Sequence, residues 1–298
     1  MTAVSRERET SGERAAYTVS LLSDQQAIRE MLEPKRAYAA YALAQLDPRH
    51  FPHNKWFVAE GPSGKALLVH SRSALGNALF ALGDPTALDV ALSLHPGPRF
   101  AFGSLMTEHK PVARKYFLMT RPQTMLRMSI TGNTFRPVDI TTRRMTGLDV
   151  SAVNRLYSME GGPAAYRPEH LDDAVYFGIF DGRQLISIAG THVVSRAERI
   201  AVVGNVFTHP RHRGHGLASA TTSAVTRELL SYCDLVALTV EAANSPAIAV
   251  YKRLGYETQC ELHETPLVRK EPFGVLSFVR RSAAGWRGRR EHKEIVPR

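Results

Sequence analysis

Residues 206–218 combine glycine, arginine and histidine at a predicted junction between a β-strand and a helix. Gly214 and Gly216 are two positions apart, and Arg211 and Arg213 come just before them. Glycine lets an anion approach the backbone without meeting a Cβ atom, and the first N–H groups of a helix lack partners within the helix. The helix dipole places about half a positive charge at the same end. The pattern therefore indicates a turn that binds a phosphate or diphosphate.

This turn differs from two common phosphate-binding motifs. It lacks the Gly-x-x-x-x-Gly-Lys-Ser/Thr pattern of a P-loop. It also lacks the third glycine of the dinucleotide motif Gly-x-Gly-x-x-Gly, because Ser219 occupies that position. A Gly-x-Gly pair alone would equally suit the ordinary start of a helix, so the functional interpretation depends on a second motif.

The second motif lies downstream, over residues 238–256, where a β-branched strand leads through Asn244 into a helix that ends at Gly255. The glycine turn resembles motif A of the GNAT superfamily of N-acetyltransferases, Gln/Arg-x-x-Gly-x-Gly/Ala. The downstream segment resembles that family's Asn-x-x-Ala-x-x-x-Tyr-x-x-x-Gly-Phe/Tyr. Both motifs occur in the family's order and on the expected elements. The resemblance covers residues 137–265 and implies an acyl-CoA N-acyltransferase fold there.

The resemblance also implies where acetyl-CoA, or another acyl-CoA, would bind as co-substrate. The pantetheine arm would lie between two parallel strands that splay apart, here residues 200–208 and 235–240. The main chain of the first strand would bond the pantetheine amides, and the N–H groups of the turn would hold the pyrophosphate. The residues implied at this site are Val206, Phe207, Thr208, Arg211, His212, Arg213, Gly214, His215, Gly216, Leu217, Ala218, Asn244, Ala247 and Tyr251. Asn244 is also a predicted helix N-cap, which is compatible with such a contact.

Three residues are candidates for catalysis. Tyr251 matches the family's usual general acid, which protonates the departing thiolate, although a packed core aromatic would fit the same position. The general base is not evident, because the strand that leads into the turn lacks the glutamate of many relatives. Asn205 could position a water there, and Glu241 at the end of the other strand is the nearest carboxylate. Glu198 and His209 are weaker candidates, better explained as surface or hydrogen-bonding residues.

The elements around these motifs predict an α/β protein with a mixed central sheet flanked by helices. The second half reads β-α-α-β-β-β-α-β-α-β-β, with a first strand over residues 138–141 and a last strand over residues 273–279. Residues 17–130 show similar elements and no catalytic motif. We therefore expect a degenerate GNAT-like domain in tandem with the catalytic one, and the alternative is an unrelated α/β cap. The expected division is residues 1–14 disordered, 15–133 degenerate or cap domain, 134–280 catalytic domain and 281–298 basic disordered tail.

Composition limits the function further. The chain has 298 residues, 44% of them hydrophobic, and a net charge of +10. Half of this charge lies in residues 280–298, where seven basic residues face two acidic ones. Trp286 is the only aromatic in that tail, so the pattern favours a solvated tail over a nucleic-acid arm. No apolar run reaches the roughly 18 residues of a membrane helix. We expect a cytoplasmic protein without a membrane partner, with Cys233 and Cys260 reduced and no bound metal.

Together these patterns predict an enzyme, an acyltransferase for groups other than aminoacyl groups. It would transfer an acetyl or other acyl group from acetyl-CoA to a primary amine on a small molecule, by direct attack in a ternary complex. One alternative is a protein acetyltransferase that acts on a lysine or an N-terminus. Another is a non-catalytic acyl-CoA sensor, which the missing strand carboxylate would favour. The acceptor, the preferred acyl length and the oligomeric state, including a homodimer, stay open.

Overall fold

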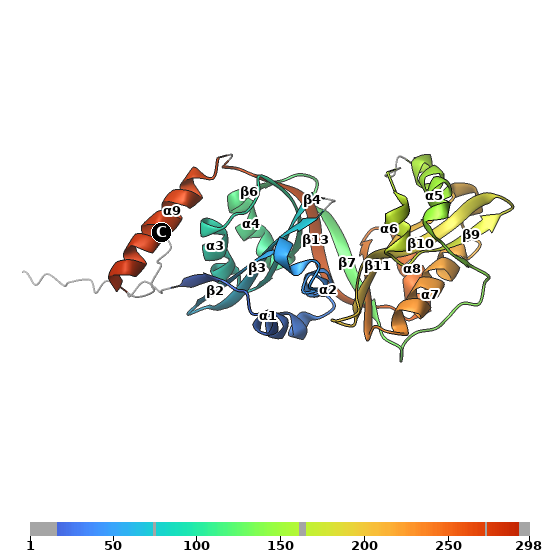
Figure 1. Cartoon of the computed structure of the whole chain (residues 1–298), viewed down its shortest axis with the longest axis horizontal. Helices are drawn as coiled ribbons and strands as arrows, with labels where there is room; N and C mark the ends of the chain where they lie inside the picture. Colours follow the sequence, from blue (N-terminus) through green and yellow to red (C-terminus); the bar gives the residue numbers. More distant parts are fainter. Residues whose placement is uncertain (1–16, 74–75, 161–164, 272, 292–298) are drawn as a thin grey trace, which may run out of the picture.

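A computed structural model describes residues 17–73, 76–160, 165–271 and 273–291. The chain forms two lobes side by side, joined by two long strands that run between them (Figure 1). The elements of the first half are β1 (Thr18–Leu21), α1 (Gln25–Leu32), α2 (Ala40–Ala44), β2 (Lys55–Gly61), β3 (Gly64–Ser73), β4 (Gly76–Gly83), α3 (Pro85–Leu94), β5 (Phe100–Met106), α4 (Lys110–Tyr116), β6 (Phe117–Met119) and β7 (Gln123–Ile130).

The second half repeats a similar succession of strands and helices. Its elements are β8 (Arg143–Arg144), α5 (Val150–Tyr157), α6 (Pro168–Asp172), β9 (Phe177–Asp181), β10 (Gln184–Ser195), β11 (Ile200–Thr208), α7 (Leu217–Leu230), β12 (Leu235–Glu241), α8 (Ser245–Leu254), β13 (Glu257–Arg269) and α9 (Val275–Glu291). The mixed α/β fold with helices on the faces of a central sheet agrees with the fold class that the sequence predicts.

The two halves share one continuous mixed sheet. Its strand order is β1-β2-β3-β4-β5-β13-β7-β12-β11-β10-β9-β8, and β6 pairs with β13 outside this path. Strand β7 from the first half lies between β12 and β13 of the second. Strand β13 continues from β7 to pair with β5 and β6 of the first half. Each half therefore supplies a strand to the other, across the domain boundary that the sequence analysis places at residues 133 and 134.

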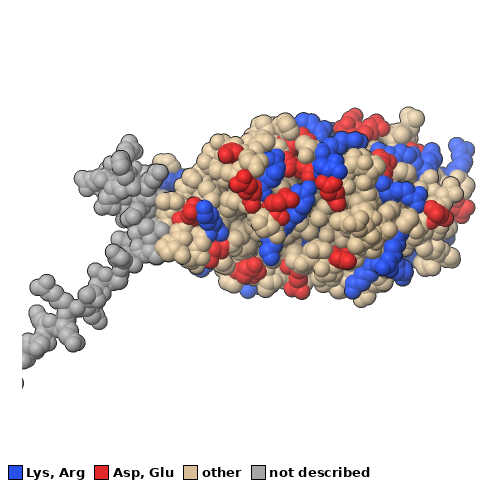
Figure 2. All heavy atoms as spheres, turned by 90° about the horizontal axis from the view of Figure 1, so that it is seen from below, with Lys and Arg blue, Asp and Glu red and all other residues tan. Residues whose placement is uncertain are grey.

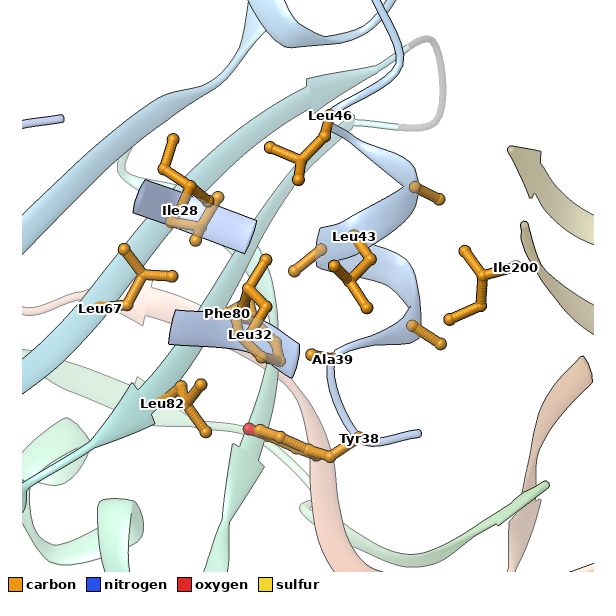
Figure 3. Packing of buried hydrophobic residues seen from close by; sticks show 14 of the residues in the cluster. Ile28, Leu32, Tyr38, Ala39, Leu43, Leu46, Leu67, Phe80, Leu82 and Ile200 are labelled. Carbon is orange, nitrogen blue, oxygen red and sulfur yellow. The ribbon is translucent and has the colours of Figure 1, made fainter. Parts of the chain in front are cut away.

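One hydrophobic core on a face of this sheet spans both lobes. Helices α1 and α2 pack there against strands of the first lobe and against β11 and β12 of the second. In Figure 3, Leu43 of α2 lies between Leu32 of α1 and Ile200 of β11, and all three side chains are fully buried. Burying large aliphatic side chains stabilises such an arrangement by about 1.5–3 kcal/mol each. The two lobes are thus fixed to each other by apolar packing as well as by the sheet.

Two predictions about the end of the chain are wrong. Residues 275–279 of the expected strand 273–279 are instead the start of helix α9, which also includes residues 281–291 of the expected disordered tail. The apolar, β-branched run indicated a strand, but Glu271 accepts a hydrogen bond from the backbone N–H of Leu276, at 2.6 Å, and caps a helix start. Arg281 anchors α9 by donating to the carbonyl of Leu94 at the end of α3, at 2.5 Å. Residues 1–14 and 292–298, predicted to be disordered, lie outside the described residues.

A smaller prediction also differs from the structure. Residues 138–141 are not a strand, and the first strand of the second half is β8 at Arg143–Arg144.

Basic and acidic side chains are interspersed over the face shown in Figure 2. Among the described residues, no helix combines the length and apolarity that crossing a bilayer requires.

Candidate active site

The parallel strands β11 and β12 separate at their carboxyl ends. Their pairing ends where Val203 lies opposite Leu238. Beyond this point β12 stays beside β7, with Thr239 opposite Arg127, whereas β11 stays beside β10. The main chain of residues 204–208 therefore faces an opening in the sheet. This is the splay that the sequence analysis expects between these two strands.

A β-bulge produces the divergence. Ile188 pairs with Phe207 and Gly190 with Gly204, so one residue of β10 faces two of β11 between these pairs. Asn205 occupies the bulge with a φ of 55°. Asparagine tolerates this left-handed backbone better than most residues. The bulge turns β11 away from β12 and aims the Asn205 side chain toward the first lobe.

The glycine turn follows β11 directly. Gly214 and Gly216 have φ angles of 86° and 75°, and a Cβ atom at either position would meet open space. Positive φ therefore explains both glycines, and it leaves the backbone accessible. Gly216 is the N-cap of α7, and among the described side chains none caps its first turn. His209 instead stabilises the entry to the turn, because its Nδ1 accepts a hydrogen bond from the N–H of Arg211 at 3.1 Å.

The corresponding turn of the first half, between β4 and α3, is not suited to binding an anion. Strand β4 leads into α3 as β11 leads into α7, and β4 pairs in parallel with β5. However, the carboxylate of Asp84 caps α3 by accepting from the N–H of Ala87 at 2.8 Å. Ser63 donates a further hydrogen bond to the same carboxylate. An anionic side chain already occupies this helix start, so a phosphate group would be repelled there.

Tyr251 lies on α8, in the core that α7 and α8 form with one face of the sheet. Its side chain is buried, and its ring centroid is 6.0 Å from that of Tyr256. Burial raises the pKa of Tyr251 to about 12. Its hydroxyl has no hydrogen-bond partner in the described part of the chain. The residue therefore holds its proton at neutral pH.

The other candidates have simpler structural roles. Asn244 is the N-cap of α8, because its Oδ1 accepts from the N–H of Ala247 at 3.1 Å. Glu241 is exposed at the end of β12. Glu198 is buried and forms a bidentate ion pair with Arg29 of α1, at 2.6 and 2.8 Å. Glu198 therefore joins the two lobes, and its carboxylate is held by Arg29 and is not suited to act as a general base.

The structure surrounds Asn205 with aromatic and imidazole side chains that the sequence analysis did not select. Asn205 Oδ1 lies 3.1 Å from His192 Nε2, and its Nδ2 donates to the hydroxyl of Tyr176 at 2.7 Å. Tyr157 donates to the carbonyl oxygen of Asn205 at 2.5 Å. On the other side, the hydroxyl of Tyr41 lies 2.5 Å from His192 Nδ1. These residues come from α2, β10, α5 and the segment before β9, and no motif connects them in the sequence.

The splayed strands, the uncapped glycine turn and the buried tyrosine together define a protein with the GNAT fold. Residues 176–264 match the family model described as FR47-like protein, and this range contains the turn, Asn205 and Tyr251. No curated protein matches the chain. Among solved structures, a GCN5-related N-acetyltransferase from Kribbella flavida has a TM-score of 0.55 at 15% identity, over 79% of this chain and 95% of its own.

Two further structures are similar in fold over most of the chain. A GCN5-related N-acetyltransferase from Sphaerobacter thermophilus has a TM-score of 0.55 at 14% identity, over 85% of this chain and 96% of its own. A tandem GNAT protein from the clavulanic acid biosynthesis pathway has a TM-score of 0.51 at 14% identity, over 86% of this chain and 99% of its own. The chain therefore has the GNAT fold.

Proposed function

We propose that the protein is an N-acyltransferase that moves an acyl group from acetyl-CoA, or another acyl-CoA, to the primary amine of a small molecule. The observation that carries this proposal is the opening between β11 and β12, with the uncapped start of α7 beyond it. Tyr251, on the helix that follows β12, supplies a buried hydroxyl with a raised pKa. A thioester could meet an amine in the opening. The start of α7 suits a diphosphate, and the Tyr251 hydroxyl suits a departing thiolate.

The turn fits the pyrophosphate of coenzyme A on three grounds. Its glycines leave open space where side chains would stand, and the first N–H groups of α7 have no side-chain cap in the described structure. Arg211 is exposed beside them and adds positive charge. The main chain of residues 206–208 faces the opening and offers hydrogen bonds to the amides of the pantetheine arm.

Acyl transfer at this site needs a proton donor and a proton acceptor. The amine attacks the thioester carbonyl, a C–N bond forms, the nitrogen loses a proton to water, and the C–S bond breaks, which leaves a thiolate. Tyr251 gives its proton to the thiolate sulfur, and its raised pKa keeps that proton in place until the thiolate forms. Direct attack in a ternary complex requires no covalent enzyme intermediate.

Helix α2 favours a small acceptor. It covers β10 and β11 on the face opposite to α7, and it places Tyr41 against His192 at the mouth of the opening. An extended peptide would need a groove across this face, which α2 crosses. A small amine can approach past the two side chains.

Isothermal titration with acetyl-CoA tests the co-substrate site. We expect the wild-type protein to bind, and the double variant Arg211→Glu, Gly214→Asp to lose binding because it places acidic groups in the turn. The matched control is Arg183→Glu, Gly132→Asp, which makes the same charge change at two exposed positions outside the site. Equal loss in both variants would mean that net charge alone drives binding, and would contradict the turn as the site.

Release of the coenzyme A thiol in the presence of primary amines tests catalysis. Thiol release that depends on an added amine supports the acyltransferase. Tight binding of acetyl-CoA without thiol release for any amine would favour a non-catalytic acyl-CoA sensor. Failure of the wild-type protein to bind acetyl-CoA, with binding of a longer acyl-CoA, would redirect the proposal to a different acyl group.

A further inference from the structure

A chain of hydrogen bonds crosses the mouth of the opening between the two strands. It runs from the hydroxyl of Tyr41 to His192 Nδ1 at 2.5 Å, from His192 Nε2 to Asn205 Oδ1 at 3.1 Å, and from Asn205 Nδ2 to the hydroxyl of Tyr176 at 2.7 Å. Tyr41 belongs to α2 of the first lobe, and the other three residues belong to the second lobe. His192 is exposed to solvent although protein surrounds it on several sides.

Two residues of this hydrogen-bond chain, His192 and Tyr41, contact residues next to the point where the strands separate. His192 lies across Gly204, where a Cβ atom would be 2.3 Å from its Nε2. Tyr41 stacks on Arg127, whose guanidinium carbon is 5.0 Å from the ring centroid. Arg127 in turn donates to Thr239 Oγ1 at 2.6 Å. The pair of Tyr41 and His192 therefore bridges β11 and β12 where the two strands begin to diverge.

The two faces of the sheet separate this pair from Tyr251. Ile200 and Val202 of β11 pack in the core formed with α1 and α2, whereas Ala201 and Val203 pack in the core that contains Tyr251. Side chains alternate between faces along a strand. Tyr251 therefore lies on one side of the opening, and Tyr41 lies on the other. Such an arrangement suits a reaction in which one side protonates a leaving group and the other removes a proton.

The hydrogen bonds fix the tautomer of His192. Asn205 donates through Nδ2 to Tyr176, so its Oδ1 faces His192 Nε2. An amide oxygen only accepts, so Nε2 must carry the imidazole proton. The lone pair of Nδ1 is then directed at the hydroxyl of Tyr41, which donates to it. The neutral imidazole is thus oriented as a proton acceptor at Nδ1.

The surrounding groups keep this imidazole neutral. Desolvation by the protein that surrounds His192 lowers its pKa, the hydrogen bond to Asn205 opposes this shift, and the charge of Arg127 lowers the pKa further. Burial raises the pKa of Tyr41 to about 12, and Arg127 and Glu264 act on it in opposite directions. Tyr176 faces Asn205 as a neutral hydroxyl. At neutral pH the pair therefore consists of a protonated tyrosine and an unprotonated histidine.

From this geometry we propose that Tyr41 and His192 form a relay that receives the proton lost by the acceptor amine. This inference rests on the proposed N-acyltransferase function. The protonated amine passes the proton that it must lose before attack to Tyr41 Oη, while Tyr41 passes its own proton to His192 Nδ1, so no free tyrosinate forms. His192 becomes an imidazolium, and it returns the proton to solvent after the products leave. Asn205 acts as a positioning residue, and the first lobe contributes a catalytic group to a site in the second.

Two acceptor amines of similar size can show whether Tyr41 and His192 act as a general base or have only a structural role. Ethylamine is protonated at neutral pH and must lose that proton before attack, whereas 2,2,2-trifluoroethylamine is far less basic and is already neutral. We expect His192→Gln and Tyr41→Phe each to reduce kcat/KM for ethylamine roughly a hundredfold. The same variants should reduce the value for trifluoroethylamine much less. His53→Gln, at an exposed histidine outside the site, serves as the control. Equal loss for both amines would overturn the relay.

A spectroscopic measurement tests the relay without any acceptor. In ¹⁵N imidazole NMR spectra of the wild-type protein, we expect His192 as the neutral tautomer protonated at Nε2, with titration below that of free histidine. The signal should change in Tyr41→Phe, which keeps the ring over Arg127 and removes only the hydroxyl. A proton on Nδ1 would overturn the assignment. Acetyl-CoA binding measured on the same samples distinguishes failure of the relay from failure of the acyltransferase proposal.

The variant Asn205→Asp tests the positioning role. A carboxylate has nearly the shape of the amide and tolerates the same left-handed backbone, but it stabilises an imidazolium at Nε2. We expect the acidic limb of the kcat/KM profile to move to higher pH in this variant. An unchanged profile would show that the protonation of His192 does not control the rate, which would overturn the proposal.

Discussion

Gly190 and Gly204 lie directly opposite each other on β10 and β11, and each leaves the space that a ring of the site occupies. A Cβ atom at Gly190 would be 2.0 Å from Cε1 of Tyr176, and one at Gly204 would be 2.3 Å from Nε2 of His192. Neither glycine has a positive φ. These two glycines are therefore required for close approach of side chains, in contrast to the glycines of the turn.

Replacing Gly204 by alanine tests this relationship. The added methyl group would push the imidazole of His192 away from Asn205 and Tyr41. A displacement of about 1 Å in a catalytic group can reduce a rate roughly a hundredfold. We expect kcat/KM for the amine to fall by that order, with acetyl-CoA affinity unchanged, as measured by thiol release and titration calorimetry. Gly132→Ala is the control, because its Cβ would meet open space. A fully active Gly204→Ala protein would contradict the required clearance.

Substitutions of two buried tyrosines, Tyr251 and Tyr256, should affect catalysis and stability separately. Tyr251→Phe removes a hydroxyl that has no partner in the described structure, so we expect kcat to fall roughly a hundredfold with little change in the free energy of unfolding. Tyr256→Phe removes a buried hydrogen bond to Thr226 of 2.7 Å, so we expect about 1 kcal/mol of destabilisation with kcat nearly unchanged. Thiol release and urea unfolding measure the two effects. The reverse pattern would assign Tyr251 to the core and remove it from the chemistry.

The local geometry of the glycine turn was predictable because local patterns determine it. A strand, a glycine turn and a helix are consecutive in the chain, and the positive φ angles of Gly214 and Gly216 leave a clear residue signature. The same holds for Asn244, whose capping bond lies within a single turn of helix. Such features need only a few neighbouring residues, so their spacing is readable without a structure.

The cluster around Asn205 was not predictable because its residues meet only through the tertiary fold. Tyr41 and His192 are far apart in sequence and come together because α2 packs across β10 and β11. The exchange of β7 and β13 between the two halves is likewise non-local. Gly204 was visible in the sequence as a small residue inside a strand pattern, which is a sign of close approach by another group. That sign did not identify His192 as the approaching side chain.

The ion pair between Arg29 and Glu198 predicts an asymmetric effect on stability. The side chain of Glu198 is 5% exposed and that of Arg29 is 34% exposed. Arg29→Met would leave a buried carboxylate without its partner, which costs about 3 kcal/mol, whereas Glu198→Gln would leave a guanidinium that water can reach and should cost about 1 kcal/mol. Urea unfolding of both variants measures the difference. Arg183→Met is the control at an exposed site. Equal costs would show that the pair contributes as an ordinary surface salt bridge.

Two neutral histidines beside α3 make the stability of the protein depend on pH. Burial lowers the pKa of His70 to about 4, and burial together with nearby cations lowers that of His95 to about 4. His70 Nε2 lies 2.8 Å from the carbonyl oxygen of His95, and His95 stacks on Phe57 with ring centroids 4.0 Å apart. Histidine in an unfolded chain titrates near pH ~6.5, so the unfolded state binds more protons between that pH and pH ~4.

The free energy of unfolding should therefore be constant above pH ~6.5 and should decrease as the pH falls toward ~4, by up to about 3 kcal/mol for His70 alone. His70→Gln keeps a donor for the carbonyl oxygen of His95 and cannot titrate. We expect this variant to show a shallower loss of stability over the same pH range, measured by urea unfolding at each pH. His53→Gln, at an exposed position, should leave the slope unchanged. If His70→Gln retained the full slope, another group would have to account for the proton uptake, and the buried neutral imidazole would not be its source.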